Sequence, residues 1–342
     1  MSIYSKMTHF ASGLKAEVKK ITAKIYVSHR IDVDSVILKD DIYCPVRCGA
    51  VFDKRNNDSS NNICGDDTGA NISKKRNMYG ELTVQYWAWK NQDVDYYGLC
   101  HYRRYLSFAD TKRMKKNCFD MVSEVAITSE NVKKHRLNDN TLILENLAEY
   151  RMIVGKGAFV GNIEVKGGKP STVRELWEAH DGIFIEKKYI ARLFDRIRTM
   201  RPEYLQYARD YFDSDTHYGF NCFVMDKELF NGLCEFQFPI LFSLEQEVVK
   251  ENYSGMMVRT LGYLGEMLYG IYVYATIQNK NVKVGEKNIV LFMTTTKVHG
   301  KKDYCLRWLK TNTRNYLADN SLRLLPRGSR RRRAVKKVLG IR

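Results

Sequence analysis

The sequence predicts an α/β fold in which a mostly parallel sheet carries helical additions and a basic C-terminal tail. Runs rich in β-branched and aromatic residues alternate with longer segments of helical spacing, in the order β–loop–α–β and later β–α–α–β. Apolar residues make up 44% of the 342 residues, which is enough for a sizeable core. Five prolines and 22 glycines argue against a fibrous or low-complexity chain.

The first half of the chain supplies most of the predicted strands. Apolar alternation indicates strands, Asn-, Asp-, Gly- and Ser-rich stretches indicate loops, and Leu82, Tyr86 and Trp89 have helical spacing. In order, we expect a helical leader at 1–22, a strand at 23–30, a short strand within 41–52, a long loop at 53–77, a helix at 79–91 and a buried strand at 94–100.

The second half is expected to be richer in helices. The predicted elements are a helix running into a strand at 141–153, a strand, a two-residue turn and a long amphipathic helix at 219–248, a long helix at 256–278 and a closing strand at 283–292. No domain boundary is obvious from composition. If the chain has two lobes, the sequence divides them near residue 110.

Positive charge is concentrated at the C-terminal end. The formal net charge is +17, and residues 327–342 carry eight Lys or Arg and no acid. Such a balance favours an anionic partner, which is a nucleic acid, an anionic membrane or a phosphorylated substrate. Apolar residues among the cations of Arg330–Arg342 favour an interfacial helix on anionic lipid.

The cysteines and the N-terminal segment point to a reducing compartment. Eight cysteines are scattered without a CxxC pair or zinc-finger spacing, which is typical of reduced thiols in a cytosolic protein. The N-terminal segment lacks the apolar run of a secretory signal. No stretch reaches the roughly 18 apolar residues that predict a membrane span.

The stretch "YGLCHYRRY" at 97–105 is the first candidate site. A strand that ends at Cys100 places His101, Arg103 and Arg104 at the carboxyl edge of the sheet, where open α/β sheets bind ligands. Guanidinium groups suit phosphate because they are planar, permanently charged and bidentate. If the strand continues, alternation sends His101 and Arg103 to one face and Arg104 to the other. The alternative is a solvated turn whose arginines pair with nearby acids.

The acidic loop "GDDTGANIS" at 65–73 is the second candidate. Asp66 and Asp67 between two glycines suit a cation, a ribose or a base, and the alternative is an Asx-rich turn. The loop is not a P-loop, because neither GxxxxGK[ST] nor GxGxxG is present.

Two polar residues lie within apolar stretches of the second half. Asn221 stands at a strand start, where it either binds a substrate hydroxyl or satisfies its own backbone. Glu266 lies in a mainly apolar helix, and burial of a carboxylate raises its pKa toward that of a general base. A structural pair with Arg259, two turns earlier on the same helical face, is the alternative.

Six stretches, in order, resemble the bacterial capsular and exopolysaccharide glycosyltransferases first catalogued as a domain of unknown function. They are "IYVSHR", "GDDTGANIS", "ELTVQYWAWKN", "YYGLCHYRRYL", "FNCFVMDKELFNGLCEFQFPILFSLE" and "RTLGYLGEMLYGIYV". The resemblance covers about residues 23–295, which it makes the transferase domain, with 296–342 as an extension that ends in the basic tail. It implies a GT-A-like nucleotide-binding sheet and transfer of galactose or galactofuranose from a nucleotide sugar, with a UDP-sugar as the expected donor.

The resemblance assigns roles to individual residues. Arg103 and Arg104, with His101, are expected to neutralise the leaving diphosphate in place of some or all of a metal, and Glu266 to act as general base. The expected nucleotide contacts are Ser28, His29, Arg30, Asp66, Asp67, Asn71 and Tyr102. Asp215, His217 and Asn221 are expected to face the acceptor or the transferred sugar, and Asp213, Asp215 and His217 are rival bases. If a metal is used, Mn²⁺ or Mg²⁺ would be held by Asp66 and Asp67.

The expected acceptor is a glycolipid or growing polysaccharide, which implies a cytoplasmic enzyme at the inner face of the plasma membrane. The rival class is a nucleic-acid-binding protein with a basic, aromatic-rich surface. No RRM, KH, OB or helix-turn-helix signature is found in the sequence, so we expect no nucleic-acid partner. A third reading is an inactive scaffold in a polysaccharide assembly complex.

Overall fold

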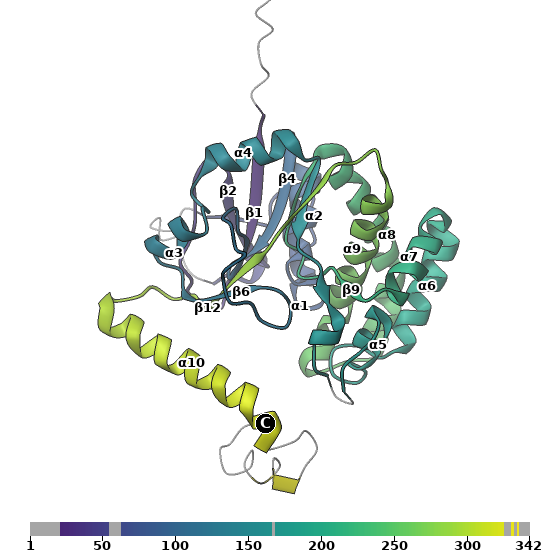
Figure 1. The fold of residues 1–342 in the computed structure, drawn as a ribbon. Coiled ribbons are helices and arrows are strands. Elements are labelled where there is room, and N and C mark those ends of the chain that lie inside the picture. Colours follow the sequence, from purple (N-terminus) through teal and green to yellow (C-terminus); the bar gives the residue numbers. More distant parts are fainter. Residues whose placement is uncertain (1–20, 55–62, 166–167, 325–329, 332–333, 335–342) are drawn as a thin grey trace, which may run out of the picture.

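The protein is described from a computed structural model (Figure 1). The structure describes residues 21–54, 63–165, 168–324, 330–331 and 334. Nearly all of the predicted helical leader (1–22) and most of the basic tail therefore lie outside the described residues. No helix in the described part is long and apolar enough to cross a membrane.

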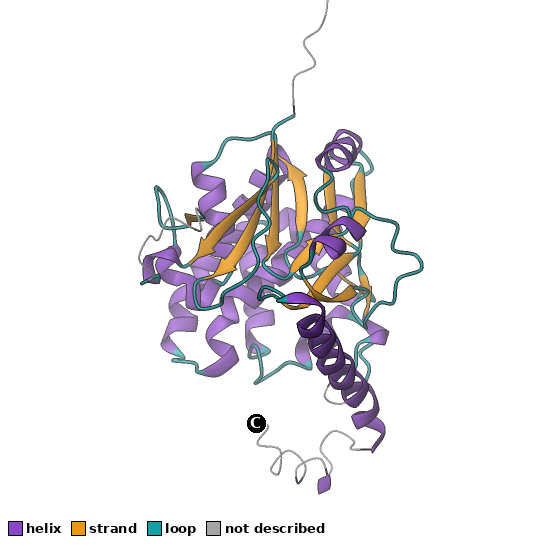
Figure 2. Cartoon of the chain, turned by 90° about the vertical axis from the view of Figure 1, so that its left-hand side faces the viewer, coloured by secondary structure: helices purple, strands orange, loops and turns teal. Residues whose placement is uncertain are grey.

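One mixed sheet forms the centre of the molecule (Figures 1 and 2). Its main path runs β11–β7–β10–β4–β1–β2–β3, and β5 joins β4 to a branch made with β12 and β6. The strands are β1 (Ala23–Arg30), β2 (Tyr43–Cys48), β3 (Cys64–Gly65), β4 (Tyr96–His101), β5 (Arg104–Leu106), β6 (Val122–Ala126), β7 (Met152–Gly155), β10 (Phe223–Asp226), β11 (Val284–Lys287) and β12 (Ile289–Thr294). The short strands β8 (Ala158–Phe159) and β9 (Thr216–His217) pair with each other.

Parallel pairing dominates the half of the sheet that carries the first predicted strands. β1 pairs in parallel with β2 and β4, β2 pairs in parallel with β3, and β10 runs antiparallel to β4 and β7. Six of the eight residues of β1 are buried, as expected for a strand between two neighbours with helices on both faces. The predicted α/β class with a mostly parallel sheet is confirmed.

Helices cover both faces of the sheet and build two cores. One core joins the sheet to α2 and α5–α9, and the other joins it to α3 and α4, which lie on the opposite side in Figure 1. The helices are α1 (Arg76–Tyr79), α2 (Leu82–Asn91), α3 (Ser129–Lys134), α4 (Asn140–Glu149), α5 (Val173–Glu178), α6 (Lys188–Met200), α7 (Leu205–Asp213), α8 (Lys227–Lys250), α9 (Thr260–Gln278) and α10 (Gly300–Leu324). Helix α10 projects from the body (Figure 1).

The structure differs from the predicted elements at two junctions. No two-residue turn separates β10 from α8, because Asp226 both ends the strand and caps the helix through a hydrogen bond from the Leu229 amide (2.9 Å). The closing strand is two strands, β11 and β12, which break at the buried Asn288. Its side chain accepts a hydrogen bond from Thr111 Oγ1 (2.6 Å). Strands from both sides of residue 110 share the one sheet.

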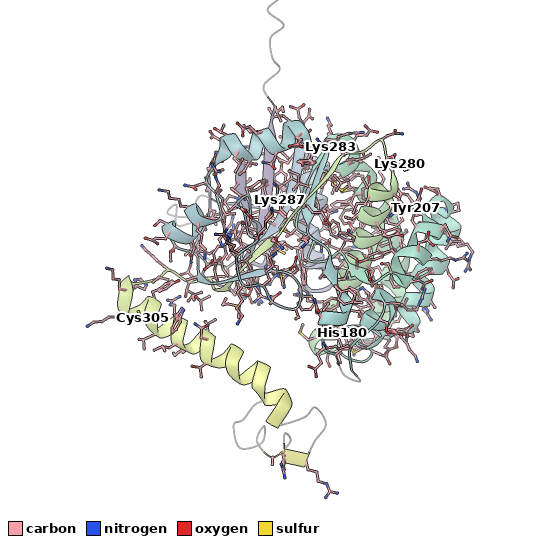
Figure 3. All side chains as sticks on the ribbon, in the orientation of Figure 1. His180, Tyr207, Lys280, Lys283, Lys287 and Cys305 are labelled. Carbon is pink, nitrogen blue, oxygen red and sulfur yellow. The ribbon has the colours of Figure 1, made fainter. Side chains whose placement is uncertain are left out.

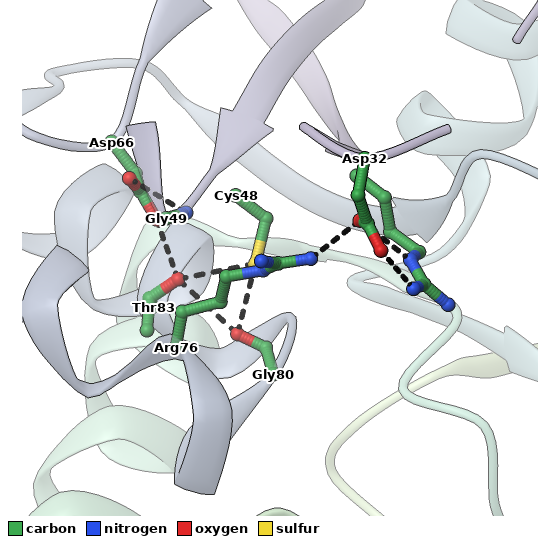
Figure 4. A network of polar contacts seen from close by, with 8 residues as sticks. Asp32, Cys48, Gly49, Asp66, Arg76, Gly80 and Thr83 are labelled. Atoms are coloured by element: carbon green, nitrogen blue, oxygen red, sulfur yellow. Dashed lines mark hydrogen bonds and ion pairs between the residues drawn. The ribbon is translucent and has the colours of Figure 1, made fainter. Parts of the chain in front are cut away.

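Asp66 holds the ends of β2 and α2 together (Figure 4). Its carboxylate accepts hydrogen bonds from the amides of Gly49 (2.9 and 3.0 Å) and Ala50 (3.0 Å) and from the hydroxyls of Ser73 and Thr83 (both 2.5 Å). The residue is fully buried. A buried carboxylate with four such donors is satisfied by the protein itself.

This network corrects the prediction that Asp66 binds the nucleotide, because its buried oxygens already accept hydrogen bonds from two amides and two hydroxyls of the protein. Asp67, which follows it, is exposed. Asp66 is buried and Asp67 is exposed, so substitutions of these two neighbouring acids can be compared directly.

We predict that Asp66→Ala lowers the free energy of unfolding by about 3 kcal/mol, because two buried amides lose their acceptor. Asp67→Ala should change it by less than about 0.5 kcal/mol. Urea denaturation monitored by circular dichroism measures both values. Equal stabilities for the two variants would contradict the structural role of Asp66.

Candidate active site

A cavity of about 640 Å³ lies where β1, β2 and β4 end. We call it the edge cavity, because its lining includes the last residues of these parallel strands, where α/β sheets bind ligands. It collects eight of the predicted site residues, namely Ser28, Arg30, His101, Tyr102, Arg103, Arg104, His217 and Glu266. The lining that the sequence did not predict includes Asp32, Arg76, Glu81, Trp177, His180, Phe184, Arg259 and Tyr263.

A tight hairpin places the central cations. β4 ends at His101, the chain turns through Tyr102 and Arg103, and β5 begins at Arg104, which is the cross-strand partner of His101. The Tyr102 amide donates to Ser28 O (3.0 Å), and Arg103 O accepts from the Phe292 amide (2.9 Å). Both neighbours of the hairpin therefore fix the turn.

The hairpin decides where these side chains lie, because β4 does not continue past His101. Alternation applies to a strand that continues, but here the chain reverses after two residues. Residues opposite each other in an antiparallel pair project to the same face. All three side chains consequently line the edge cavity.

Arg103 and Arg104 have no carboxylate partner in the described part of the chain. Neither forms an ion pair with any residue that the structure describes, and the Nε of each is buried without a hydrogen-bond partner there. The Arg104 guanidinium lies over the Phe220 ring, 4.7 Å from its centroid. Burial and the nearby Arg103 lower the pKa of Arg104. Partly buried guanidinium groups that repel each other are stabilised by an anion bound between them.

His101 is neutral beside these arginines. Burial and the positive charges of Arg104 and Arg103 hold its pKa well below the usual range. Its Nδ1 is buried and has no hydrogen-bond partner among the described residues. His101 can therefore donate or accept one hydrogen bond without adding charge.

A second pair of arginines shares one carboxylate at the rim. Arg30 Nε donates to Asp32 Oδ1 (3.0 Å), and Arg76 Nη2 donates to the same oxygen (2.6 Å; Figure 4). The hydrogen bond from Arg30, with the charge of Arg76, lowers the pKa of Asp32. Two cations on one acid leave this rim net positive.

Glu81 is a site residue that the sequence did not single out. Its two oxygens accept hydrogen bonds from Asn221 Nδ2 (3.1 Å) and Arg259 Nη2 (3.0 Å). The alternative pairing of Arg259 with Glu266 is therefore not the one formed, and Asn221, predicted to face the acceptor or the transferred sugar, donates to the Glu81 carboxylate. The glycine before Glu81 was the one signal in the sequence that could have pointed to this position. Gly80 has a φ of +57°, and a Cβ there would lie 2.5 Å from Arg259 Nη2, so a residue with a side chain would not fit.

A strained turn holds Glu266. Phe220 and Asn221 have φ values of +71° and +44°, which is uncommon for residues with side chains. This conformation directs the Phe220 amide to Glu266 Oε1 (3.0 Å). Gly219 has no side chain to obstruct the contact, since a Cβ there would lie 2.7 Å from the same oxygen.

Glu266 has the properties of a general base. Its side chain is 16% exposed, and burial together with Glu81 raises its pKa, although the Phe220 amide acts in the opposite direction. His217 Nε2 lies 3.8 Å from Glu266 Oε1. Burial lowers the pKa of His217 to about 4, so this histidine is neutral near pH 7 and weaker as a base than the carboxylate.

Several predicted residues do not line the edge cavity. His29 alternates away from Ser28 and Arg30, and its Nδ1 contacts Ser35 Oγ (2.9 Å). Asn71 is exposed, and its side chain accepts from the Ser73 amide (3.2 Å), which is the Asx turn that was the alternative reading.

The rival acids of the second half also lie outside the edge cavity. Asp213 is exposed and pairs with Arg174 (3.3 Å). Asp215 is exposed and accepts from Thr216 Oγ1 (2.9 Å). Neither is placed to reach a ligand bound at His101 and Arg104.

The residues expected to hold a metal do not fit one. The oxygens of Asp66 already accept four donors, and the exposed Asp67 does not line the edge cavity. Within the described ranges, no group of three or more His, Cys, Asp or Glu could hold a metal ion.

Comparison with known proteins places the fold in a family. Residues 24–279 match the family model described as a domain of unknown function, DUF4422. The chain belongs to this family. A solved structure titled "WbbM bifunctional glycosytransferase apo structure" is similar, with 28% sequence identity and a TM-score of 0.69. The match covers 82% of this chain and 47% of the WbbM chain, so this chain spans about half the length of that protein. No curated protein matches.

We predict that Arg104→Met raises the melting temperature of this DUF4422 protein by about 2 °C, because an unpaired, partly buried charge is removed. Inorganic pyrophosphate at about 100 times its Kd should stabilise the wild type by about 2.7 kcal/mol and the variant far less. Differential scanning calorimetry with and without pyrophosphate measures both effects. Arg198→Met on α6, whose arginine pairs with Asp195, is the matched control. An unchanged pyrophosphate response in Arg104→Met would argue against an anion site.

Proposed function

We propose that the protein is a glycosyltransferase that moves galactose or galactofuranose from a UDP-sugar to a lipid-linked or growing surface-polysaccharide acceptor. The observation that carries the proposal is the pair Arg103 and Arg104 at the carboxyl edge of the sheet, neither of which forms an ion pair with a described residue. The DUF4422 match and the similarity to a structure titled a glycosyltransferase support the reaction class.

The donor diphosphate would lie against the arginine half of the edge cavity, which we define as Arg30, Arg76, Arg103 and Arg104. These side chains surround the ends of β1 and β4. Ser28 and Tyr102 line the same part and offer hydroxyls to the nucleoside. Guanidinium groups bind phosphate oxygens in pairs, which orients the diphosphate as well as attracting it.

The transfer step is a displacement at the anomeric carbon of the donor sugar. An acceptor hydroxyl forms the new C–O bond while its proton passes to Glu266. The bond from the anomeric carbon to the phosphate oxygen breaks, and its electron pair stays on the diphosphate. Arg103 and Arg104 stabilise the charge that develops there, which is usually the largest single catalytic contribution. Glu266 serves as the general base of an inverting transfer.

The arginines take the part that a divalent metal has in many transferases. They carry permanent charge and line the part of the edge cavity where the leaving group would lie. The Asp66 carboxylate, in contrast, already accepts hydrogen bonds from the protein itself. We propose no step through a metal.

We further propose that the segment Arg330–Arg342 attracts the enzyme to the anionic inner face of the plasma membrane, which suits a lipid-linked acceptor. This segment lies mostly outside the described residues, so the proposal rests on its charge. Loss of co-sedimentation with phosphatidylglycerol vesicles after removal of residues 327–342, with transfer to a soluble acceptor retained, tests it. Loss of transfer itself would favour another role for the tail.

The proposed activity predicts that purified protein transfers sugar from at least one member of a UDP-sugar panel, and that this donor protects it from thermal unfolding. Arg103→Ala should lower turnover at least about tenfold while the fold survives, because a transition-state contact is lost. Radiolabelled-sugar transfer, repeated in excess EDTA and with Mn²⁺, is the measurement. Near-wild-type turnover in Arg103→Ala, or full loss in EDTA, would overturn the role of the arginines.

The raised pKa of Glu266 predicts the pH dependence of transfer. A base must be ionised to accept a proton, so kcat/KM should rise with pH through an apparent pKa above the usual value of about 4.5 for Glu. In Glu266→Gln this limb should disappear and turnover should fall at least about 100-fold. A fully active Glu266→Gln would return attention to His217, the rival base that lines the edge cavity.

A further inference from the structure

One side of the edge cavity is a continuous row of aromatic rings, which we call the aromatic wall. Its members are Trp177 in α5, His180 and Phe184 in the following loop, and Tyr263 in the first turn of α9. His180 stacks on Phe184 (centroids 4.8 Å apart, 15° between planes), and Phe184 stacks on Tyr263 (4.9 Å, 28°). Trp177 lies 6.3 Å from His180. Figure 3 places His180 in the helical part of the molecule.

Trp177 carries a buried donor that nothing in the described structure satisfies. The residue is 5% exposed and lines the edge cavity. Its Nε1 has no hydrogen-bond partner among the described residues. A buried indole N–H without an acceptor costs free energy, and indole donors usually find a partner when buried. A ligand oxygen at this position would supply one.

The charge near the aromatic wall distinguishes it from the arginine half. Arg259 lies 5.8 Å from the Tyr263 ring, but its charge is paired with Glu81. The ligand of this side therefore needs no negative charge. It needs an apolar face to lie on the rings and hydroxyl groups for the indole N–H. A sugar ring has both, whereas an acyl chain has no hydroxyl to offer.

Both ends of the row lead to the general base. Tyr263 precedes Glu266 by one helical turn, and Trp177 packs edge-on against His217 (5.8 Å), which lies 3.8 Å from Glu266 Oε1. A ring that lies on the aromatic wall would therefore present its edge hydroxyls toward Glu266.

We propose that the aromatic wall is the acceptor subsite and that it binds a neutral sugar residue of the acceptor by apolar contact with its rings, with Trp177 Nε1 donating to a sugar oxygen. This inference rests on the proposed function, because it assigns the second substrate of the same reaction. It divides the edge cavity into a donor side built from cations and an acceptor side built from rings, with Glu266 between them.

The test uses the full chain with the active UDP-sugar as donor and a panel of methyl glycosides as acceptors. Trp177→Phe keeps a ring but removes the N–H, and Phe184→Leu removes the ring that stacks between His180 and Tyr263. Each should raise the acceptor KM roughly tenfold, the equivalent of one lost hydrogen bond or ring contact. UDP binding and donor hydrolysis without acceptor should stay within about twofold of wild type. Tyr207→Leu, an exposed tyrosine at a distance from His180 in Figure 3, is the matched control.

Two results would overturn the acceptor assignment. Weaker UDP binding in Trp177→Phe and Phe184→Leu would mean that the wall holds the nucleobase. An unchanged acceptor KM in both variants would mean that the sugar binds elsewhere. Circular dichroism melts confirm that each variant is folded. If Phe184→Leu does not fold, the more conservative Trp177→Phe still tests the assignment.

Failure of the proposed function gives a different result. In that case the wild type neither binds UDP nor hydrolyses any UDP-sugar. The wall is then tested alone by tryptophan fluorescence during titration with methyl glycosides. A saturable change that disappears in Trp177→Phe supports sugar binding, and no change in the wild type contradicts it.

Discussion

The turn between β4 and β5 is the constraint on which the site depends. β4 pairs with β1 on one side and β10 on the other, so its path is fixed by the centre of the sheet. Because the chain reverses directly after His101, the next side chains cannot leave the carboxyl edge. Arg103 and Arg104 are therefore held near each other despite their repulsion, and the stability of the surrounding sheet offsets that cost. A surface loop with the same sequence would let the two arginines separate into water.

The carboxylates are placed by a second constraint, the left-handed turn at Phe220 and Asn221. One turn brings an amide to Glu266 and a side-chain amide to Glu81, so an acid within α9 and the N-cap acid of α2 are fixed by consecutive residues. Glu81 is then neutralised by Arg259, whereas Glu266 accepts a hydrogen bond from the neutral Phe220 amide, lies 3.8 Å from His217 and stays in a mostly buried position. The difference in partners explains why one acid is a structural anchor and the other is suited to take a proton.

Local patterns in the sequence predicted the fold better than the site. The strand at 23–30 and the helix–strand unit at 141–153 carry strong periodicity and appear nearly as predicted, as β1 and as α4 with β7. Ser28, His29 and Arg30 all end β1, but only Ser28 and Arg30 line the edge cavity, because alternation turns the His29 ring away. Glu81 and Trp177 could not be assigned from pattern, since each is an ordinary residue of a helix end until distant segments pack against it. The prediction for the acidic loop was wrong for the opposite reason. Asp66 has the residue type of a ligand-binding acid, yet its carboxylate oxygens already accept hydrogen bonds from nearby amides and hydroxyls.

The edge cavity combines a cationic side with an aromatic side, and the two sides suit ligands of different charge. A nucleoside diphosphate and a sugar acceptor differ most in charge, so a cavity that separates cations from rings binds each substrate in one orientation. The arginines come from the sheet edge, whose backbone is fixed by β1 and β12, while the rings come from α5, its following loop and α9. Under the proposed function, the two substrates are bound by different elements, and Glu266 lies where these elements meet. Changes in the α5 loop would then alter the acceptor without disturbing the anion site.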